Sequence, residues 1–166
     1  MTMSVRGRAK AAERPGTLPA VAVKTGAIGK TYPSFTYEVG KEKIAEYARA
    51  IGAENPVHFD RDAAREAGFR DVVAPPMFAV VYSSGSVAPG IFDPEVGIDF
   101  ATMVHGGQEF VWGEPVVSGD VITTTTEVKD VSEKAGKGFY VFESVSTNQD
   151  GQEVVRGTWT NIVRGV

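Results

Sequence analysis

The segment Ala74–Val81 constrains the fold most strongly, because it combines helical character with apolar side chains on nearly every side. It opens on Pro75 and Pro76, which the first turn of a helix tolerates because N–H groups there lack intrahelical partners. A helix without a polar face has to be enclosed by other elements. The sequence therefore predicts a buried helix that ends by Gly85 to Gly90, with Pro89 in the loop that follows.

The chain after this helix has the composition of a β-sheet. Val, Thr and aromatic residues, which suit a pleated and half-buried surface, dominate it, and clusters of Asn, Asp, Ser and Gly mark its turns. The pattern predicts strands at Gln108–Trp112, Val121–Val131, Phe139–Thr147 and Val154–Val163, the last with Val155, Trp159 and Val163 on one face.

Shorter elements precede the apolar helix. Phe35–Val39 alternates like a strand, and Lys41–Ile51 follows as a helix that ends at Gly52. Asp60 is placed to cap a further short helix, which ends before Gly68. The apolar face of the helix at 41–51 is formed by Ile44, Tyr47, Ala48 and Ile51. Together these patterns indicate an α+β protein whose antiparallel sheet wraps the apolar helix.

The length of 166 residues fits one domain, which we place at residues 25–166, after a flexible basic tail at residues 1–24. Residues 1–30 carry six basic groups and one acidic group, a charge of +5; because the whole chain carries −4, the remainder carries −9. An acidic body argues against nucleic acid as a partner. The absence of cysteine excludes disulfides and thiol chemistry. We expect a cytoplasmic protein, because the sequence has neither a membrane-span-length apolar run nor a signal-peptide pattern.

The loop between the two predicted helices, Ile51–Asp60, resembles the signature of the MaoC-like (R)-specific hydratases and dehydratases. That signature reads roughly Gly-Asp-x-Asn-Pro-x-His, followed by a small residue. Gly52, Asn55, Pro56 and His58 match it, and Ala64 stands at the later small position. The acid of the signature is replaced by Ala53.

The resemblance extends from about Gly29 to Arg164 and is strongest to the N-terminal MaoC-like dehydratase group, which includes mycobacterial hydroxyacyl dehydratase subunits. The other matching stretches are residues 37–44, 73–78, 104–110 and 114–120. The resemblance implies a hot-dog fold, in which a sheet wraps a long helix. It also implies a cofactor-free enzyme that acts on acyl thioesters of CoA or acyl carrier protein, as a homodimer or as a heterodimer with another MaoC-like chain.

In this family the acid and the histidine hold and activate a water. His58 is therefore the candidate base, since its ordinary pKa lies near neutral pH; the alternative is a histidine that only hydrogen-bonds within its loop. Asn55 either fixes the water or the thioester by its amide, or simply initiates a turn before proline. Glu54 is the carboxylate nearest in sequence and is the candidate replacement acid, unless it is a solvated charge.

The resemblance also places the substrate at the start of the apolar helix. In catalytic members a glycine amide there receives the enolate oxygen, whereas the comparable residues here are Ala74 and Pro75, so the N–H of Met77 or Phe78 has to serve. We expect Pro75, Pro76, Met77, Phe78 and Tyr82 to bind substrate; the alternative, which is the simpler explanation of the apolar residues, is a plain core role. The remaining histidine, His105, lacks the spacing of a metal site, and we expect no metal.

Three functions remain open. The first is a (3R)-hydroxyacyl-thioester dehydratase or trans-2-enoyl-thioester hydratase subunit of fatty-acid metabolism, with His58 in the site. The second is a non-catalytic acyl-thioester-binding subunit of a heterodimeric dehydratase, which Ala53 and Pro75 favour. The third is a thioesterase, since one fold hosts several thioester chemistries.

Overall fold

A single antiparallel sheet dominates the computed structural model, which describes residues 22–165; most of the predicted tail lies outside these residues. The strand order across the sheet is β1-β3-β4-β5-β2, and every neighbouring pair is antiparallel. The strands are β1 (Phe35–Glu38), β2 (Met103–Trp112), β3 (Val121–Lys134), β4 (Lys137–Thr147) and β5 (Glu153–Arg164). All the predicted strands are confirmed. Strand β1 ends one residue before the predicted Val39, and the other four strands extend beyond their predicted bounds.

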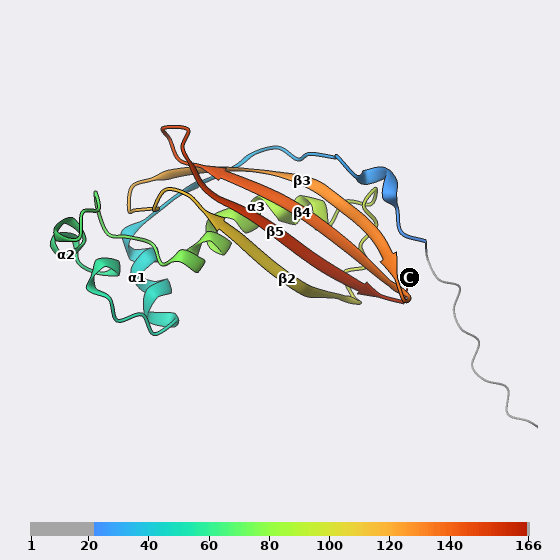
Figure 1. The fold of residues 1–166 in the computed structure, drawn as a ribbon, viewed down its shortest axis with the longest axis horizontal. Coiled ribbons are helices and arrows are strands. Elements are labelled where there is room, and N and C mark those ends of the chain that lie inside the picture. Colours follow the sequence, from blue (N-terminus) through green and yellow to red (C-terminus); the bar gives the residue numbers. More distant parts are fainter. Residues whose placement is uncertain (1–21, 166) are drawn as a thin grey trace, which may run out of the picture.

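Helix α3 (Ala79–Ile91) lies along one face of this sheet and contacts β1, β3 and β4 (Figure 1). Helices α1 (Lys41–Ala50) and α2 (Arg61–Glu66) lie together at one end of the molecule, far from the C-terminus. Short 3₁₀ turns complete the fold at η1 (Thr25–Ala27), η2 (Pro56–His58) and η3 (Pro76–Phe78). The predicted α+β layout, with a sheet packed on an apolar helix, is confirmed. Among the helices of residues 22–165, every one is too short or too polar to cross a bilayer.

The apolar helix differs from its prediction at both ends. The segment from Pro76 to Phe78 is a 3₁₀ turn, and regular α-helix begins only at Ala79. At the other end the helix continues to Ile91 and includes Pro89, so the prediction of a loop at Pro89 is wrong. Proline removes one hydrogen bond to the carbonyl four residues earlier and crowds that carbonyl. The residue four positions earlier is Gly85, where a β-carbon would lie only 2.6 Å from the Phe35 ring, so a bare backbone is required there.

The first helix is also one residue shorter than predicted. Ile51 follows α1 as its C-cap and is 53% exposed, so it does not belong to the buried face that Ile44 and Ala48 form. Gly52 then turns the chain with φ +69°, a left-handed conformation that glycine adopts without a steric penalty.

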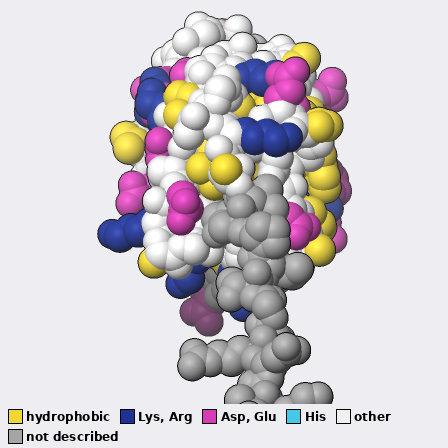
Figure 2. All heavy atoms as spheres, turned by 90° about the vertical axis from the view of Figure 1, so that its right-hand side faces the viewer, with side chains coloured by type: hydrophobic (Ala, Val, Ile, Leu, Met, Phe, Trp, Pro, Cys, Tyr) yellow, Lys and Arg dark blue, Asp and Glu magenta, His cyan; other side chains and the backbone are white. Residues whose placement is uncertain are grey.

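The sheet and α3 enclose two apolar clusters. One contains Phe78 and Tyr82 near the α1–α2 end, and the other contains Phe142 and Tyr140 further along α3. Alternating residues of β5 point into this core, including Val155, Trp159 and Val163, as predicted. At the end of the molecule away from α1 and α2, basic and acidic side chains are interspersed on the surface (Figure 2).

Strand β2 forms one edge of the sheet. Its pairing with β5 is interrupted by a bulge between His105 and Gly107. Gly106 is required there, since a β-carbon at this position would lie 2.6 Å from the Ile162 side chain.

Candidate functional site

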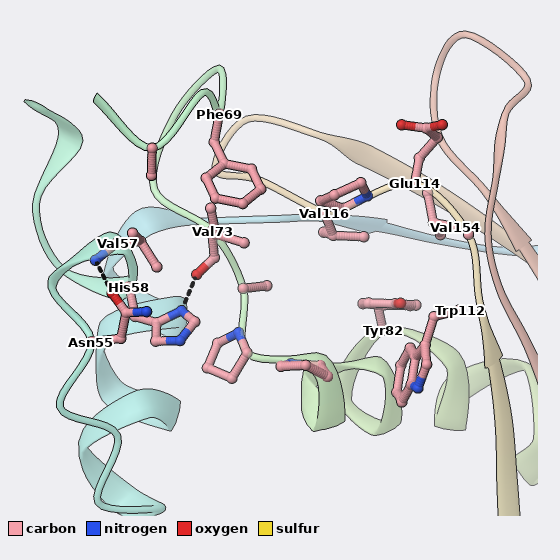
Figure 3. A pocket seen from close by; sticks show the side chains of 16 residues that line it. Asn55, Val57, His58, Phe69, Val73, Tyr82, Trp112, Glu114, Val116 and Val154 are labelled. Atoms are coloured by element: carbon pink, nitrogen blue, oxygen red, sulfur yellow. Dashed lines mark hydrogen bonds between the residues drawn. The ribbon is translucent and has the colours of Figure 1, made fainter. Parts of the chain in front are cut away.

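A cavity of about 430 Å³ lies between the loops at the α1–α2 end, the start of α3 and the ends of the strands (Figure 3). Its walls combine two loop segments, α3 and strand ends that are distant in the sequence. The lining residues are Asn55, Val57, His58, Ala67, Phe69, Val73, Ala74, Pro75, Pro76, Tyr82, Trp112, Gly113, Glu114, Pro115, Val116 and Val154. Most of these side chains are apolar, so the cavity fits a hydrocarbon-bearing ligand.

His58 occupies one wall of the cavity, and a single hydrogen bond selects the tautomer of its neutral imidazole. Its Nδ1 lies 2.8 Å from the carbonyl oxygen of Val73 (Figure 3). A carbonyl only accepts, so Nδ1 carries the hydrogen, and a neutral imidazole then has its lone pair on Nε2. The arrangement gives the residue a defined base, which is the property that general-base catalysis requires.

The His58 loop is built by local hydrogen bonds. Asn55 is the N-cap of the turn η2, where its side-chain oxygen accepts from the Val57 N–H at 3.2 Å. Pro56 occupies the first position of the turn, where its missing N–H leaves no donor unpaired. Because Oδ1 of Asn55 is engaged in this way, its NH₂ group remains for a ligand oxygen.

Backbone pairs fix the opposite wall to this loop. The Val73 N–H donates to the carbonyl of Val57, and the Ala74 N–H donates to the carbonyl of Val116. Asp120, only 1% exposed, supports the segment after Val116 by accepting from the Val117 N–H at 2.8 Å. The His58 loop, the start of α3 and the segment before β3 therefore form one connected frame.

Two of the three predicted catalytic residues line the cavity, and the third does not. His58 and Asn55 lie side by side on its wall, whereas Glu54 is exposed and is not a lining residue. The single carboxylate among the described lining residues is Glu114, which lies across the cavity from His58 in Figure 3. Glu114 stands alone before a proline, without a catalytic pattern around it, although it belongs to one of the stretches that resemble the family.

Three of the five predicted substrate-binding residues line the cavity, and the other two do not. Pro75, Pro76 and Tyr82 line the cavity. Phe78 is fully buried and packs edge-on against Tyr47, so it belongs to the core, as the alternative interpretation stated. The Met77 side chain is 45% exposed and is not a lining residue.

Few backbone donors remain at the start of α3. The Ala74 N–H is bonded to Val116, and the Phe78 N–H donates to the Pro75 carbonyl at 2.8 Å. Pro75 and Pro76 have no N–H. Met77 is therefore the one residue of positions 74–78 whose N–H is not engaged in these ways.

Several lining residues carry no signal in the sequence. Phe69 comes from the loop after α2, and Trp112 ends β2. Val116 lies in the segment between β2 and β3, and Val154 is the second residue of β5. Each looks like ordinary core in the sequence, and only the packing of strand ends against the loops brings them together. The other histidine, His105, is exposed on β2, and within residues 22–165 no group of three His, Asp or Glu side chains converges on a point.

Comparison with known proteins agrees with this architecture. The profile of the FAS1-like dehydratase domain region matches residues 26–156. A UPF0336 protein of Clavibacter michiganensis is 43% identical over 138 residues, which cover 82% of this chain and 93% of the relative. A UPF0336 protein of Saccharopolyspora erythraea is 40% identical over 139 residues, which cover 83% of this chain and 89% of the relative.

Solved structures give the same result. A chain of the C-terminally truncated HadBC (3R-hydroxyacyl-ACP dehydratase) complex from Mycobacterium tuberculosis superposes with a TM-score of 0.73 at 30% identity, over 84% of this chain and 99% of that one. The (R)-hydratase of A. caviae, at 20% identity and a TM-score of 0.62 over 86% and 97% of the two chains, shares the fold.

The predicted hot-dog fold is thus confirmed, as a sheet packed on one long helix with a cavity at the helix start. The chain belongs to the MaoC-like hot-dog dehydratase family.

Proposed function

We propose that this chain is a subunit of a (3R)-hydroxyacyl-thioester dehydratase, the enzyme that in reverse hydrates trans-2-enoyl thioesters of CoA or acyl carrier protein in fatty-acid metabolism. The observation that carries the proposal is His58, whose Nδ1 is held by the Val73 carbonyl in the wall of an apolar cavity. Hydration requires a base for the water, and Nε2 of His58 supplies one. The apolar walls suit the acyl chain.

A second candidate is a subunit that binds the acyl thioester while another MaoC-like chain performs the chemistry. Ala53 stands at the position of the signature acid, Glu54 is exposed, and the start of α3 offers one free N–H at most. Hydration also needs a group to move the proton and donors for the developing enolate. A partner chain with the complete signature would supply both, and the similar HadBC structure is a complex of two chains.

Turnover of trans-2-enoyl-CoA separates the two candidates. We would measure hydration by the purified chain alone, and again after mixing it with a MaoC-like chain that carries the intact Asp-x-Asn-Pro-x-His loop. Under the first candidate, His58→Ala lowers the rate by roughly 10²–10⁴-fold, the usual contribution of a general base. His105→Ala, which changes the other histidine, on β2, is the matched control and leaves the rate unchanged.

Each outcome assigns a role. If only the mixture is active, and its activity is unchanged by His58→Ala, the chain is the binding subunit and His58 takes no part in the chemistry. Release of free CoA from saturated acyl-CoA would replace both candidates with a thioesterase. A chain that neither binds nor turns over acyl thioesters, alone or mixed, contradicts the proposed function.

A further inference from the structure

Tyr82 is the most deeply buried polar side chain among the residues that line the cavity. It lies near the start of α3, is 2% exposed, and its ring packs against Phe78 with a centroid separation of 6.2 Å. Figure 3 shows the ring inside the cavity, between Val116 and Trp112. The ring is therefore fixed by core packing, and its hydroxyl occupies a defined place in an apolar wall.

The hydroxyl of Tyr82 has no hydrogen-bond partner among residues 22–165. Among these residues, the one fully enclosed side-chain polar atom without a partner is Oε1 of Gln108, so the Tyr82 hydroxyl is not sealed within protein and reaches the open space of the cavity. A buried hydroxyl is costly to leave unpaired, which favours an occupant with an acceptor at this point. Burial raises the pKa of Tyr82, so the phenol keeps its proton and is available as a donor.

Donors of other kinds are scarce on this side of the site. The N–H groups of Ala74 and Phe78 are already bonded, and Pro75 and Pro76 have none. This leaves the N–H of Met77, a residue that does not line the cavity. Every acyl group of the proposed class, saturated, unsaturated or hydroxylated, carries the thioester carbonyl as an acceptor. A phenol that faces the cavity is the side-chain counterpart of the backbone donor that the prolines remove.

We propose that the Tyr82 hydroxyl donates a hydrogen bond to the carbonyl oxygen of the bound acyl thioester. The inference rests on the proposed function, because it requires an acyl thioester in the cavity. It gives this residue a recognition role beyond lining the acyl channel: the cavity distinguishes a thioester from a hydrocarbon of the same length by one donor.

A cycle of two deletions tests the proposal. Tyr82→Phe removes only the hydroxyl from the protein, and replacing decanoyl-pantetheine with decyl-pantetheine, a thioether, removes only the carbonyl from the ligand. We would measure the dissociation constants of both ligands for the purified wild-type chain and the variant. Tyr82→Phe is expected to weaken decanoyl-pantetheine binding about fivefold, the effect of one neutral hydrogen bond, and to leave decyl-pantetheine binding unchanged.

Tyr140→Phe is the matched control, because Tyr140 is also buried but belongs to the other apolar cluster and does not line the cavity. Equal binding of decanoyl-pantetheine by wild type and Tyr82→Phe overturns the inference while the proposed function stands. A loss that also appears with decyl-pantetheine or with Tyr140→Phe overturns it too, because it reports general loosening. Failure of the wild-type chain, alone and in the mixture, to bind either ligand contradicts the proposed function itself.

If Tyr82→Phe does not fold, the wild-type chain still provides a test. Decanoyl-pantetheine, which lacks the adenine chromophore of CoA, is then expected to change the tyrosine ultraviolet absorption when the phenol bonds to the carbonyl, and decyl-pantetheine is not. An identical spectral change with the two ligands overturns the inference.

Discussion

The imidazole of His58 is bonded through Nδ1 to the main-chain carbonyl of Val73, at 2.8 Å, across 15 residues of sequence. The same two segments are joined a second time, because the Val73 N–H donates to the carbonyl of Val57. The orientation of the histidine therefore depends on main-chain atoms, which substitution of neighbouring side chains does not remove.

His58→Asn separates the structural role of this histidine from its chemical role. The side-chain NH₂ of asparagine occupies nearly the place of Nδ1 and keeps a donor for the Val73 carbonyl, but no atom replaces Nε2. We expect thermal stability close to that of the wild type and hydratase activity as low as that of His58→Ala. Melting temperature and enoyl-CoA turnover are the two measurements. Retained turnover in His58→Asn would show that Nε2 is not the base.

Restoring the signature acid tests whether it is the missing part of the site. Ala53→Asp places a carboxylate at the signature position, and we expect the chain alone to gain enoyl hydration by about 10²-fold, the lower range of acid–base catalysis. Glu54→Gln, next to it and exposed, is expected to have no effect. Hydration rates of the purified variants decide the matter, and an inactive Ala53→Asp chain would point to the donors at the start of α3 instead.

Asp120 supports the cavity wall from within. It is 1% exposed, accepts from the Val117 N–H and forms an ion pair with Arg70 at 2.8 Å. Asp120→Ala leaves a buried N–H without its acceptor, which is expected to lower the free energy of unfolding by about 1–3 kcal/mol. Urea unfolding measures this, and Asp130→Ala, which changes an exposed aspartate, should stay within experimental error of the wild type.

Gly90→Ala is expected to disrupt the packing of α3 on the sheet. A β-carbon there would lie 2.5 Å from the ring of Phe142, which is fully buried and has no room to move. Overpacking of this kind costs about 1–3 kcal/mol. Gly26→Ala, where a β-carbon meets nothing within 4 Å, is the control, and equal melting temperatures for the two variants would contradict the prediction.

Stability should fall in acid partly through Asp93. Asp93 accepts hydrogen bonds from the Lys30 ammonium, the Glu95 backbone N–H and the Tyr32 hydroxyl. These bonds lower the pKa of Asp93 to about 2. Because this pKa lies below the unfolded value of about 3.9, the stabilisation is present above pH 4 or so and is lost as the pH falls towards 2. We expect Asp93→Asn to be less stable than wild type near neutral pH and to lose less stability across this acid range. Denaturation midpoints between those pH values measure the difference, with the exposed Asp150→Asn as the control.

The sheet was predictable because strand alternation is a local property of the sequence, as in the residues of β5 that alternate between core and surface. The course of α3 was not, because proline normally ends a helix, whereas α3 continues through Pro89 to Ile91. In the site, the resemblance of the loop to the family signature indicated His58 and Asn55. The walls formed by Val116, Val154 and Trp112 depend on how distant strand ends pack, and periodicity carries no information on that.

The bulge at His105–Gly107 has a consequence for how copies of this chain associate. An edge strand exposes unpaired main-chain groups that any extended peptide can join. The bulge bends the edge and divides it, so that the register is unbroken over residues 103–105 and again over residues 107–112. Growth into fibrils needs a long flat template, and an edge divided in this way does not offer one.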